Sequence, residues 1–272
     1  MTLPPSGQTT VAGIIGQPVR HSLSPAIHNA AYAALGLDWV YVAFPVAPGA
    51  VRDALVGLRA AGVAGCNVTM PHKTEAARAC DELTPSAATL DAANTVVLGG
   101  GANSGDSTDG AGFVDAAREA DVDLEGRVLV VGAGGAARAI VDALAPLGSR
   151  VTVAARRPDA AATAAALAPG ATTVGLDRLD DAVSQSDVVV NATPLGMCGE
   201  PPPFDPARLH AGQVVIDAVY APPETPLLAA ATARGARTVN GLGMLVHQAA
   251  RSFTRLTGEP APLDVMRAAA AP

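Results

Sequence analysis

Short apolar runs alternate with stretches of helical periodicity along the first third of the chain. Each of the two helical stretches is followed by a glycine, Gly36 or Gly62, which is a typical helix stop. We expect Ser24 to be the N-cap of the first helix, with Pro25 at its first helical position. The predicted strands cover residues 10–15, 39–44 and 65–69, and the predicted helices cover 25–35 and 51–61. This alternation of strand and helix indicates an α/β layer with a mostly parallel sheet.

The second half of the chain repeats the alternation more clearly. Its predicted strands are 127–131, 150–154, 187–191, 213–217 and 238–240, and its predicted helices are 136–147, 159–167 and 244–256. The valine run 188–190 fits a strand that is buried on both faces. Between the halves, the glycine-rich segment 99–105 predicts a turn or hairpin before a short strand near Ser107. A helix from about Ala111 then leads into a second domain.

The composition excludes several classes of protein. A chain of 272 residues exceeds a typical domain of about 150, so two domains are expected. With 49% hydrophobic and 16% charged residues the chain has enough apolar material for a core, but only 3% aromatic residues, so alanine, valine and leucine must fill it. A net charge of −7 argues against a nucleic-acid partner, because phosphate binding requires a basic surface.

Cysteine and histidine usage predicts a cytoplasmic protein without a metal site. Cys66, Cys80 and Cys198 form no C-x-x-C pair, which argues against a disulfide framework and a structural zinc, and we expect Cys66 and Cys198 to be buried small hydrophobes. The five histidines show no metal-ligand spacing; we expect His28 on a helix and His72 in a loop. No apolar run reaches 18 residues, and the first basic residue is Arg20, so neither a membrane partner nor a signal peptide is expected.

A glycine-rich turn between a strand and a helix predicts a dinucleotide site. Residues 128–139 place Gly132, Gly134 and Ala137 at the three small positions of the dinucleotide fingerprint. The helix that follows offers free N–H groups and a positive dipole end to phosphates. The alternative is a purely structural turn.

The end of the next strand indicates which dinucleotide is bound. An NAD enzyme places Asp or Glu there for the ribose hydroxyls, whereas this chain has Arg156 and Arg157. Two guanidinium groups suit a 2′-phosphate in charge and geometry, which favours NADP. The alternative is a solvated arginine pair.

Three polar motifs lie in the first 110 residues. Ser22 and Ser24 stand two apart before a helix, so their hydroxyls could bind a carboxylate; simple capping by Ser24 is the alternative. The segment 67–73 ends in Lys73 beyond a strand's carboxyl end, where α/β proteins bind ligands, although a solvated lysine is equally compatible. Asn94 and Asp109 form the third motif, and Asp109 could instead cap the following helix.

Together these motifs resemble the shikimate dehydrogenase family from Gly16 to about Gln248. Each motif alone is weak, but their order and spacing are specific. The matching segments are Gly-x-Pro-x-x-His-Ser-x-Ser-Pro-x-x-His-Asn at 16–29, Asn-Val-Thr-x-Pro-x-Lys at 67–73, Asn-Thr at 94–95, Thr-Asp-Gly at 108–110, Gly-Ala-Gly-Gly-Ala at 132–136, Asn-Ala-Thr-Pro-Leu-Gly-Met at 191–197, Asp-x-x-Tyr at 217–220 and Gly-x-x-Met-Leu-x-x-Gln at 241–248.

The resemblance implies a role for each matching residue. Lys73 and Asp109 would be the catalytic pair, and Ser22 and Ser24 would bind the substrate carboxylate. The other substrate-binding residues would be Thr69, Asn94, Tyr220 and Gln248. The residues implied in cofactor binding are Gly132, Ala133, Gly134, Gly135, Ala136, Arg156, Arg157, Thr193 and Gly241.

The family has two α/β domains with a cleft between them, which implies a substrate-binding domain of residues 1–109 plus 241–272. Residues 110–240 would form a Rossmann-type NADP-binding domain. The implied reaction is the reversible NADPH-dependent reduction of 3-dehydroshikimate to shikimate in aromatic amino acid biosynthesis, by a monomer or homodimer. The alternatives are a quinate/shikimate or aminoshikimate dehydrogenase with relaxed selectivity and, from another class, a non-catalytic NADP sensor.

Three departures from the family pattern stand out. Ser107 replaces the asparagine usual before Thr-Asp-Gly, and Asp91 replaces a common glycine. Ala155 replaces the asparagine that usually precedes the cofactor-selecting arginine. The last change removes a polar group from the adenosine end, and none removes a residue expected to do chemistry.

Overall fold

The computed structural model describes residues 4–99 and 101–271, and its chain divides into two compact units. Unit 1 comprises the chain up to Thr108 and again from Val246 onward, and unit 2 comprises Asp109–Leu245. Helix α10 (Leu242–Thr257) runs from unit 2 into unit 1. Each unit is described separately.

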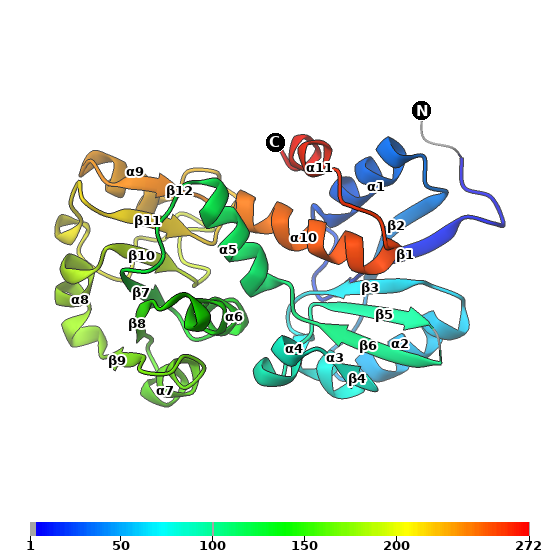
Figure 1. Ribbon diagram of the computed structural model, residues 1–272, viewed down its shortest axis with the longest axis horizontal. Helices are drawn as coiled ribbons and strands as arrows, with labels where there is room; N and C mark the ends of the chain where they lie inside the picture. The colour runs from blue at the N-terminus through cyan, green and yellow to red at the C-terminus, as the bar shows by residue number, and fades with distance from the viewer. Residues whose placement is uncertain (1–3, 100, 272) are drawn as a thin grey trace. The chain divides into compact units, whose positions relative to one another are not determined.

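Unit 1 contains a six-stranded sheet in the order β2-β1-β3-β5-β6-β4 (Figure 1). Its strands are β1 (Thr10–Gly16), β2 (Trp39–Pro45), β3 (Gly65–Val68), β4 (Glu82–Leu83), β5 (Thr95–Gly99) and β6 (Ala102–Asp106). Strand β1 pairs in parallel with β2 and β3, and β4 pairs in parallel with β6, whereas β5 is antiparallel to β3 and β6. The glycine-rich segment thus forms the predicted hairpin, although Gly100 lies outside the described residues.

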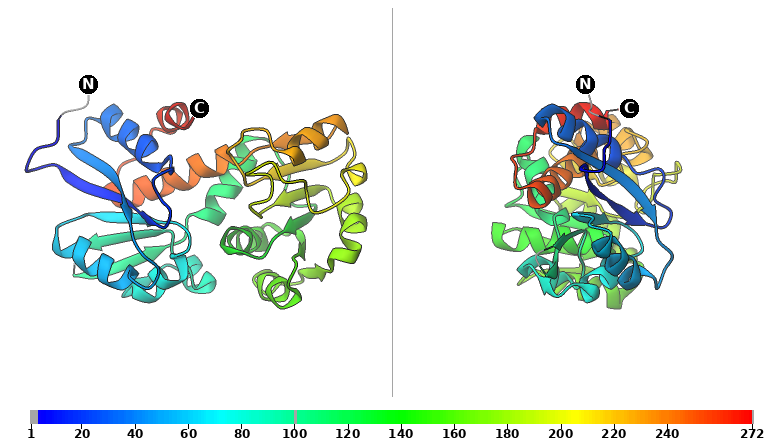
Figure 2. Two further views of the ribbon diagram at one scale, coloured as in Figure 1. Left: turned by 180° about the vertical axis from the view of Figure 1, so that it is seen from behind. Right: turned by 90° about the vertical axis from the view of Figure 1, so that its right-hand side faces the viewer.

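Helices cover both faces of this sheet. They are α1 (Ser24–Leu35), α2 (Val51–Ala60), α3 (Lys73–Ala79), α4 (Pro85–Leu90), the later part of α10, and α11 (Leu263–Ala270). Leu55 of α2 and Ala76 of α3 share one buried cluster with Ile15 and Val96 of the sheet. On the other face, His28 of α1 packs against Phe253 of α10. The C-terminal helix α11 lies beside α1 in Figure 1 and Figure 2.

The prediction that Ser24 caps α1 is wrong by one residue. Leu23 is the N-cap and makes no side-chain capping bond, so Ser24 is already helical. The Ser22 hydroxyl accepts a hydrogen bond from the Ser24 N–H at 3.2 Å and thereby satisfies one N-terminal donor from outside the helix. The helix ends at Gly36 as predicted, because Gly36 adopts a left-handed φ of 65°.

A buried histidine makes the stability of unit 1 sensitive to acid. His28 is fully buried and stacks on Tyr41, with ring centroids 4.3 Å apart. In the described part of the chain, neither of its ring nitrogens has a hydrogen-bond partner. Burial lowers the pKa of His28 from 6.5 to about 3, because a charged imidazolium would lose its hydration.

We therefore expect the His28→Phe variant to resist acid better than the parent protein. Below pH 6.5 the unfolded chain binds a proton that the folded protein excludes, so folding stability falls as pH falls, by about 1.4 kcal/mol per unit. Unfolding free energies from urea melts between pH 7 and 4.5 should fall about 2.5 kcal/mol further for the parent than for the variant. Parallel pH profiles for the two proteins would show that His28 does not resist protonation in the folded state.

Unit 2 is a six-stranded, fully parallel sheet in the order β12-β11-β10-β7-β8-β9. Its strands are β7 (Arg127–Val131), β8 (Arg150–Ala154), β9 (Thr172–Val174), β10 (Val188–Asn191), β11 (Val214–Asp217) and β12 (Arg237–Val239). This is the strand order of a doubly wound dinucleotide-binding fold, in which the chain direction across the sheet reverses between β7 and β10. Ligands bind such sheets beyond the carboxyl ends of the strands at this reversal.

Alternate residues of the central strands enter two separate cores. Val128 and Val130 of β7 pack with one helical layer, and Leu129 and Val131 pack with the other, as expected for a strand buried on both faces. The first layer contains α5 (Asp109–Glu119), α6 (Gly135–Leu144) and α7 (Pro158–Ala165), and the second contains α8 (Leu179–Gln185) and α9 (Pro226–Ala233). Short 3-10 turns at Ala145–Leu147, Leu176–Arg178 and Pro206–Arg208 complete the unit.

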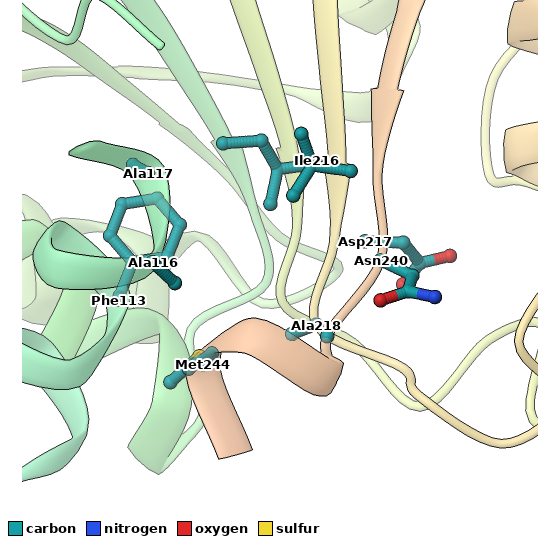
Figure 3. Close-up of a pocket in the computed structure, with 10 residues that line it drawn as sticks. Phe113, Ala116, Ala117, Ile216, Asp217, Ala218, Asn240 and Met244 are labelled. Atoms are coloured by element: carbon teal, nitrogen blue, oxygen red, sulfur yellow. The ribbon is translucent and has the colours of Figure 1, made fainter. Parts of the chain in front are cut away.

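A small cavity lies in the first core of unit 2. Figure 3 shows Ile216 of β11 pointing toward Phe113 of α5, while Asp217 points away from it. The cavity volume is about 10 Å³, which is room for about one water molecule. It is a packing gap and not a ligand site.

All three cysteines are free. Cys66 is buried in β3 as predicted, but Cys198 is exposed, so the prediction for Cys198 is wrong. Cys198 lies in the loop that follows β10, where no element covers it. Among the described helices, none has the length and apolar character needed to cross a membrane.

Candidate active site

The two serines of the first motif lie together at the start of α1. The Ser22 hydroxyl donates to the Ser24 hydroxyl across 3.2 Å. Ser24 is 5% exposed and Ser22 is half-buried. Both hydroxyls therefore stand beside the amino end of a 12-residue helix, where N–H groups and the helix dipole favour an anion.

The carboxyl end of β3 brings Thr69, Lys73 and Asn94 into one region of unit 1. Thr69 follows β3 directly, and its methyl group fills the space that a Cβ at Gly16 would need. Lys73 is the first residue of α3, and its carbonyl accepts a hydrogen bond from the Ala93 N–H at 2.9 Å. The Asn94 carbonyl accepts from the Val68 N–H at 2.7 Å, which ties Asn94 to the end of the same strand.

Asn94, Thr108 and Gln248 converge although 154 residues separate the first from the last. The Asn94 Nδ2 group donates to Thr108 Oγ1 at 2.9 Å and to Gln248 Oε1 at 3.4 Å. Thr108 Oγ1 also donates to the Gln248 carbonyl at 3.1 Å. These contacts place two of the predicted substrate-binding residues side by side.

The implied catalytic pair is divided between the two units. Lys73 belongs to unit 1, and Asp109, which opens α5, belongs to unit 2. Asp109 is 8% exposed and follows directly on Thr108, which is part of the Asn94 cluster. The pairing of Lys73 with Asp109 stays a prediction.

The glycine loop after β7 fits a dinucleotide. Gly132 has a φ of 124°, and a Cβ there would lie 2.8 Å from the Ala192 carbonyl oxygen, so only glycine allows this approach of β7 to the end of β10. Gly134 caps α6 and Gly135 begins it, and both are exposed with nothing near the position of a Cβ. The amino end of the 10-residue α6 is therefore open to a phosphate group.

A cavity of about 520 Å³ adjoins this loop within unit 2. It is large enough for a substantial part of a dinucleotide. Arg156 and Arg157 lie on its wall directly after β8, and both are exposed. The predicted cofactor residues that line it are Gly132, Ala133, Gly134, Arg156, Arg157 and Thr193.

A buried carboxylate joins the loops that carry Thr193 and Tyr220. Asp217 is fully buried and accepts hydrogen bonds from Asn191 Nδ2 at 2.9 Å and from Thr225 Oγ1 at 2.7 Å. Asn191 Oδ1 in turn accepts from the Thr193 hydroxyl at 2.7 Å. Burial raises the pKa of Asp217, and its hydrogen bonds oppose the rise.

Tyr220 and Gly241 lie in the neighbouring loops that follow β11 and β12. The Gly241 N–H donates to the Val219 carbonyl at 3.1 Å, one residue before Tyr220. Tyr220 is half-buried, and burial raises the pKa of its hydroxyl. Thr193, Tyr220 and Gly241 thus follow the neighbouring strands β10, β11 and β12.

The structure accounts for one of the three departures from the family pattern. Asp91 ends α4 with a left-handed φ of 45°, which explains why glycine suits this position. Its carboxylate pairs with Arg78 at 2.6 Å. Nothing in the structure explains Ser107 or Ala155.

Sequence reasoning missed the residues that hold the site together. Thr108, Asn191 and Asp217 lie inside the family motifs, but the sequence pattern alone indicates no role for them. The only available signal was their place beside residues with expected functions, because hydrogen bonding between distant segments leaves no periodic pattern in a sequence.

Comparison with known proteins places these features in one family. The profile described as "Shikimate dehydrogenase substrate binding domain" matches residues 14–96, and "Shikimate / quinate 5-dehydrogenase" matches residues 116–195. "Shikimate 5'-dehydrogenase C-terminal domain" matches residues 241–271. The chain belongs to the shikimate dehydrogenase family.

Relatives in the shikimate dehydrogenase family match nearly the whole chain. The "Shikimate dehydrogenase (NADP(+))" of Citrifermentans bemidjiense is 47% identical, over 98% of this chain and 96% of its own. The solved shikimate 5-dehydrogenase of Thermus thermophilus, in complex with NADP(H) and shikimate, has a TM-score of 0.89 at 35% identity and covers 96% of this chain and 98% of its own. Quinate dehydrogenase from Corynebacterium glutamicum, in complex with NAD, has a TM-score of 0.90 at 32% identity, with the same two coverages.

Proposed function

We propose that this chain catalyses the reversible NADPH-dependent reduction of 3-dehydroshikimate to shikimate, a step of aromatic amino acid biosynthesis. Two features of the same chain carry the proposal: a hydroxyl- and amide-rich cluster within unit 1, and an arginine-bearing cavity beside the glycine loop within unit 2. Full-length relatives named as NADP-dependent shikimate dehydrogenases support the same assignment.

Unit 1 supplies the groups that a polyhydroxylated carboxylic acid requires. Ser22 and Ser24 receive the carboxylate at the amino end of α1, where charge-assisted hydrogen bonds are strongest. Asn94 and Gln248 bind ring hydroxyls through their amides, together with Thr69. Tyr220 of unit 2 completes the set of substrate-binding residues.

Lys73 supplies the proton in the reduction direction. Negative charge grows on the carbonyl oxygen as the carbonyl carbon is reduced, and a positioned acid that protonates this oxygen lowers the barrier. Lys73 is the only lysine among the 18 lysine and arginine residues of the chain. Arginine remains protonated in proteins, so a lysine at this one position fits a group that must lose and regain a proton. Asp109 is the second catalytic residue and orients the ammonium group or shares its proton.

Unit 2 holds the nicotinamide cofactor, which supplies the hydride when bound. The loop 132–136 and the amino end of α6 bind the pyrophosphate, and Arg156 with Arg157 binds the 2′-phosphate. Thr193 and Gly241 position the nicotinamide end. Two arginines at this place favour NADP over NAD, because only NADP carries a 2′-phosphate.

We place the enzyme in the cytoplasm, as a monomer or homodimer. Three free cysteines support a reducing compartment. The net charge of −7 argues against a nucleic-acid partner.

Product analysis tests the proposal directly. Purified protein is incubated with 3-dehydroshikimate and NADPH, and the products are identified by mass spectrometry and proton NMR. The expected result is one shikimate formed for each NADPH consumed. NADPH binding without product formation would instead identify a non-catalytic NADP-binding protein.

A further inference from the structure

Ser252 is a buried hydroxyl at the centre of a polar cluster in unit 1. It lies on α10, is 0% exposed, and stands four residues after Gln248 on the same helix face. Its Oγ atom lies 2.8 Å from Asn67 Nδ2, 2.7 Å from Thr95 Oγ1 and 3.3 Å from Thr108 Oγ1. No role in substrate or cofactor binding follows from its position, since it is enclosed by protein.

The Tyr41 end of this cluster fixes the direction of its first hydrogen bonds. The Tyr41 hydroxyl donates to Asn67 Oδ1 at 2.6 Å, so the Asn67 amide nitrogen faces Ser252 and donates to it. The Ser252 proton is then available for Thr95, and the Thr95 hydroxyl donates to Asn94 Oδ1 at 3.2 Å. Each donor in this series of hydrogen bonds has an acceptor, as a buried polar network requires.

The cluster also fixes which way the Asn94 amide faces. Asn94 Oδ1 accepts from the Thr108 backbone N–H at 2.9 Å, and a backbone N–H only donates. The Asn94 amide oxygen therefore faces the Thr95 hydroxyl and the Thr108 N–H, and its Nδ2 group faces the Thr108 hydroxyl and Gln248. A flipped amide would oppose two donors and is excluded while Thr95 and Thr108 are held in place.

We propose that Ser252 is a positioning residue for the substrate site, which holds Thr95 and Thr108 so that Asn94 and Gln248 present their amides in one fixed arrangement. This inference rests on the proposed function, because it assigns Asn94 and Gln248 to the substrate. Ser252 itself does not touch the substrate. It acts on substrate binding through the orientation of the two amides.

The test is steady-state kinetics of the Ser252→Ala variant with shikimate and NADP. We expect KM for shikimate to rise about tenfold, equivalent to about 1.4 kcal/mol, while kcat and KM for NADP change less than about twofold. Thr95→Val removes the next hydroxyl at nearly constant shape and should raise KM for shikimate similarly. Both variants interrupt the same series of hydrogen bonds. KM for shikimate in the double variant should therefore be no more than about twice that of either single variant.

Ala249→Gly is the matched control. Ala249 is 1% exposed on the same helix, and its replacement weakens α10 without touching the cluster. Its melting temperature should fall while KM for shikimate stays at the parent value. Unchanged KM in both Ser252→Ala and Thr95→Val would overturn the inference, as would fully additive effects in the double variant. An inactive parent enzyme would refute the proposed function instead.

Discussion

Replacing Lys73 with alanine should lower kcat for shikimate oxidation by about 10²- to 10⁴-fold, the usual worth of a positioned general acid or base. KM for shikimate should rise far less, because Ser22, Ser24, Asn94 and Gln248 still bind the substrate. The expectation follows from the place of Lys73 at the start of α3, beside the Asn94 segment. Stopped-flow or steady-state absorbance of NADPH at saturating shikimate measures the change.

Two further variants separate proton transfer from simple charge. Lys73→Arg keeps the positive charge but removes a group that can release its proton, so kcat should stay low. Arg78→Ala removes an exposed cation from the same helix and should leave kcat unchanged. A near-normal kcat in Lys73→Ala would remove Lys73 from the chemistry, and full activity in Lys73→Arg would reduce its role to charge.

Removing Arg156 and Arg157 together should lower kcat/KM for NADP by about 10²- to 10⁴-fold. Each guanidinium in contact with a phosphate dianion contributes about 1.5–3 kcal/mol, and both side chains lie on the wall of the dinucleotide cavity. The kcat/KM for NAD should change little, because NAD has no 2′-phosphate. The ratio of the two kcat/KM values in the Arg156→Ala/Arg157→Ala variant is the quantity to measure.

Arg150→Ala is the control for the loss of a positive charge. Arg150 is an exposed arginine at the opposite end of the same strand β8, away from the glycine loop. Its loss should leave the NADP to NAD ratio unchanged. If the double arginine variant still prefers NADP by the parental margin, other residues select the cofactor.

The elements with strong periodicity were predictable, and those whose formation depends on tertiary contacts were not. Strands 127–131 and 150–154 are rich in valine and match β7 and β8 residue for residue. Strand β4 (Glu82–Leu83) has two residues and forms only because β6 is beside it. Helix α8 has only seven residues, of which Leu179 and Val183 are buried, so its apolar stripe is too short to predict a helix.

The candidate site likewise contains residues that the sequence indicates and residues that come together only on folding. Lys73, Asn94 and the glycine loop stand in contiguous motifs, so the sequence alone indicated them. Ser252 is a lone serine in a helix, and its partner Asn67 is 185 residues away. Only folding shows that Ser252 and Asn67 share a hydrogen bond. The start of α1 differs from the prediction for a local reason, because Ser22 accepts a hydrogen bond from the N–H of Ser24, which is already helical.

Initial velocities of shikimate oxidation, with NADP and NAD in parallel and quinate as the second substrate, test the central claim most directly. We expect rapid turnover of shikimate with NADP and far lower kcat/KM for the other three pairs. Comparable turnover of quinate, or a preference for NAD, would contradict the assignment of substrate and cofactor. Absence of turnover with every pair, in protein that binds NADPH, would contradict the enzyme itself.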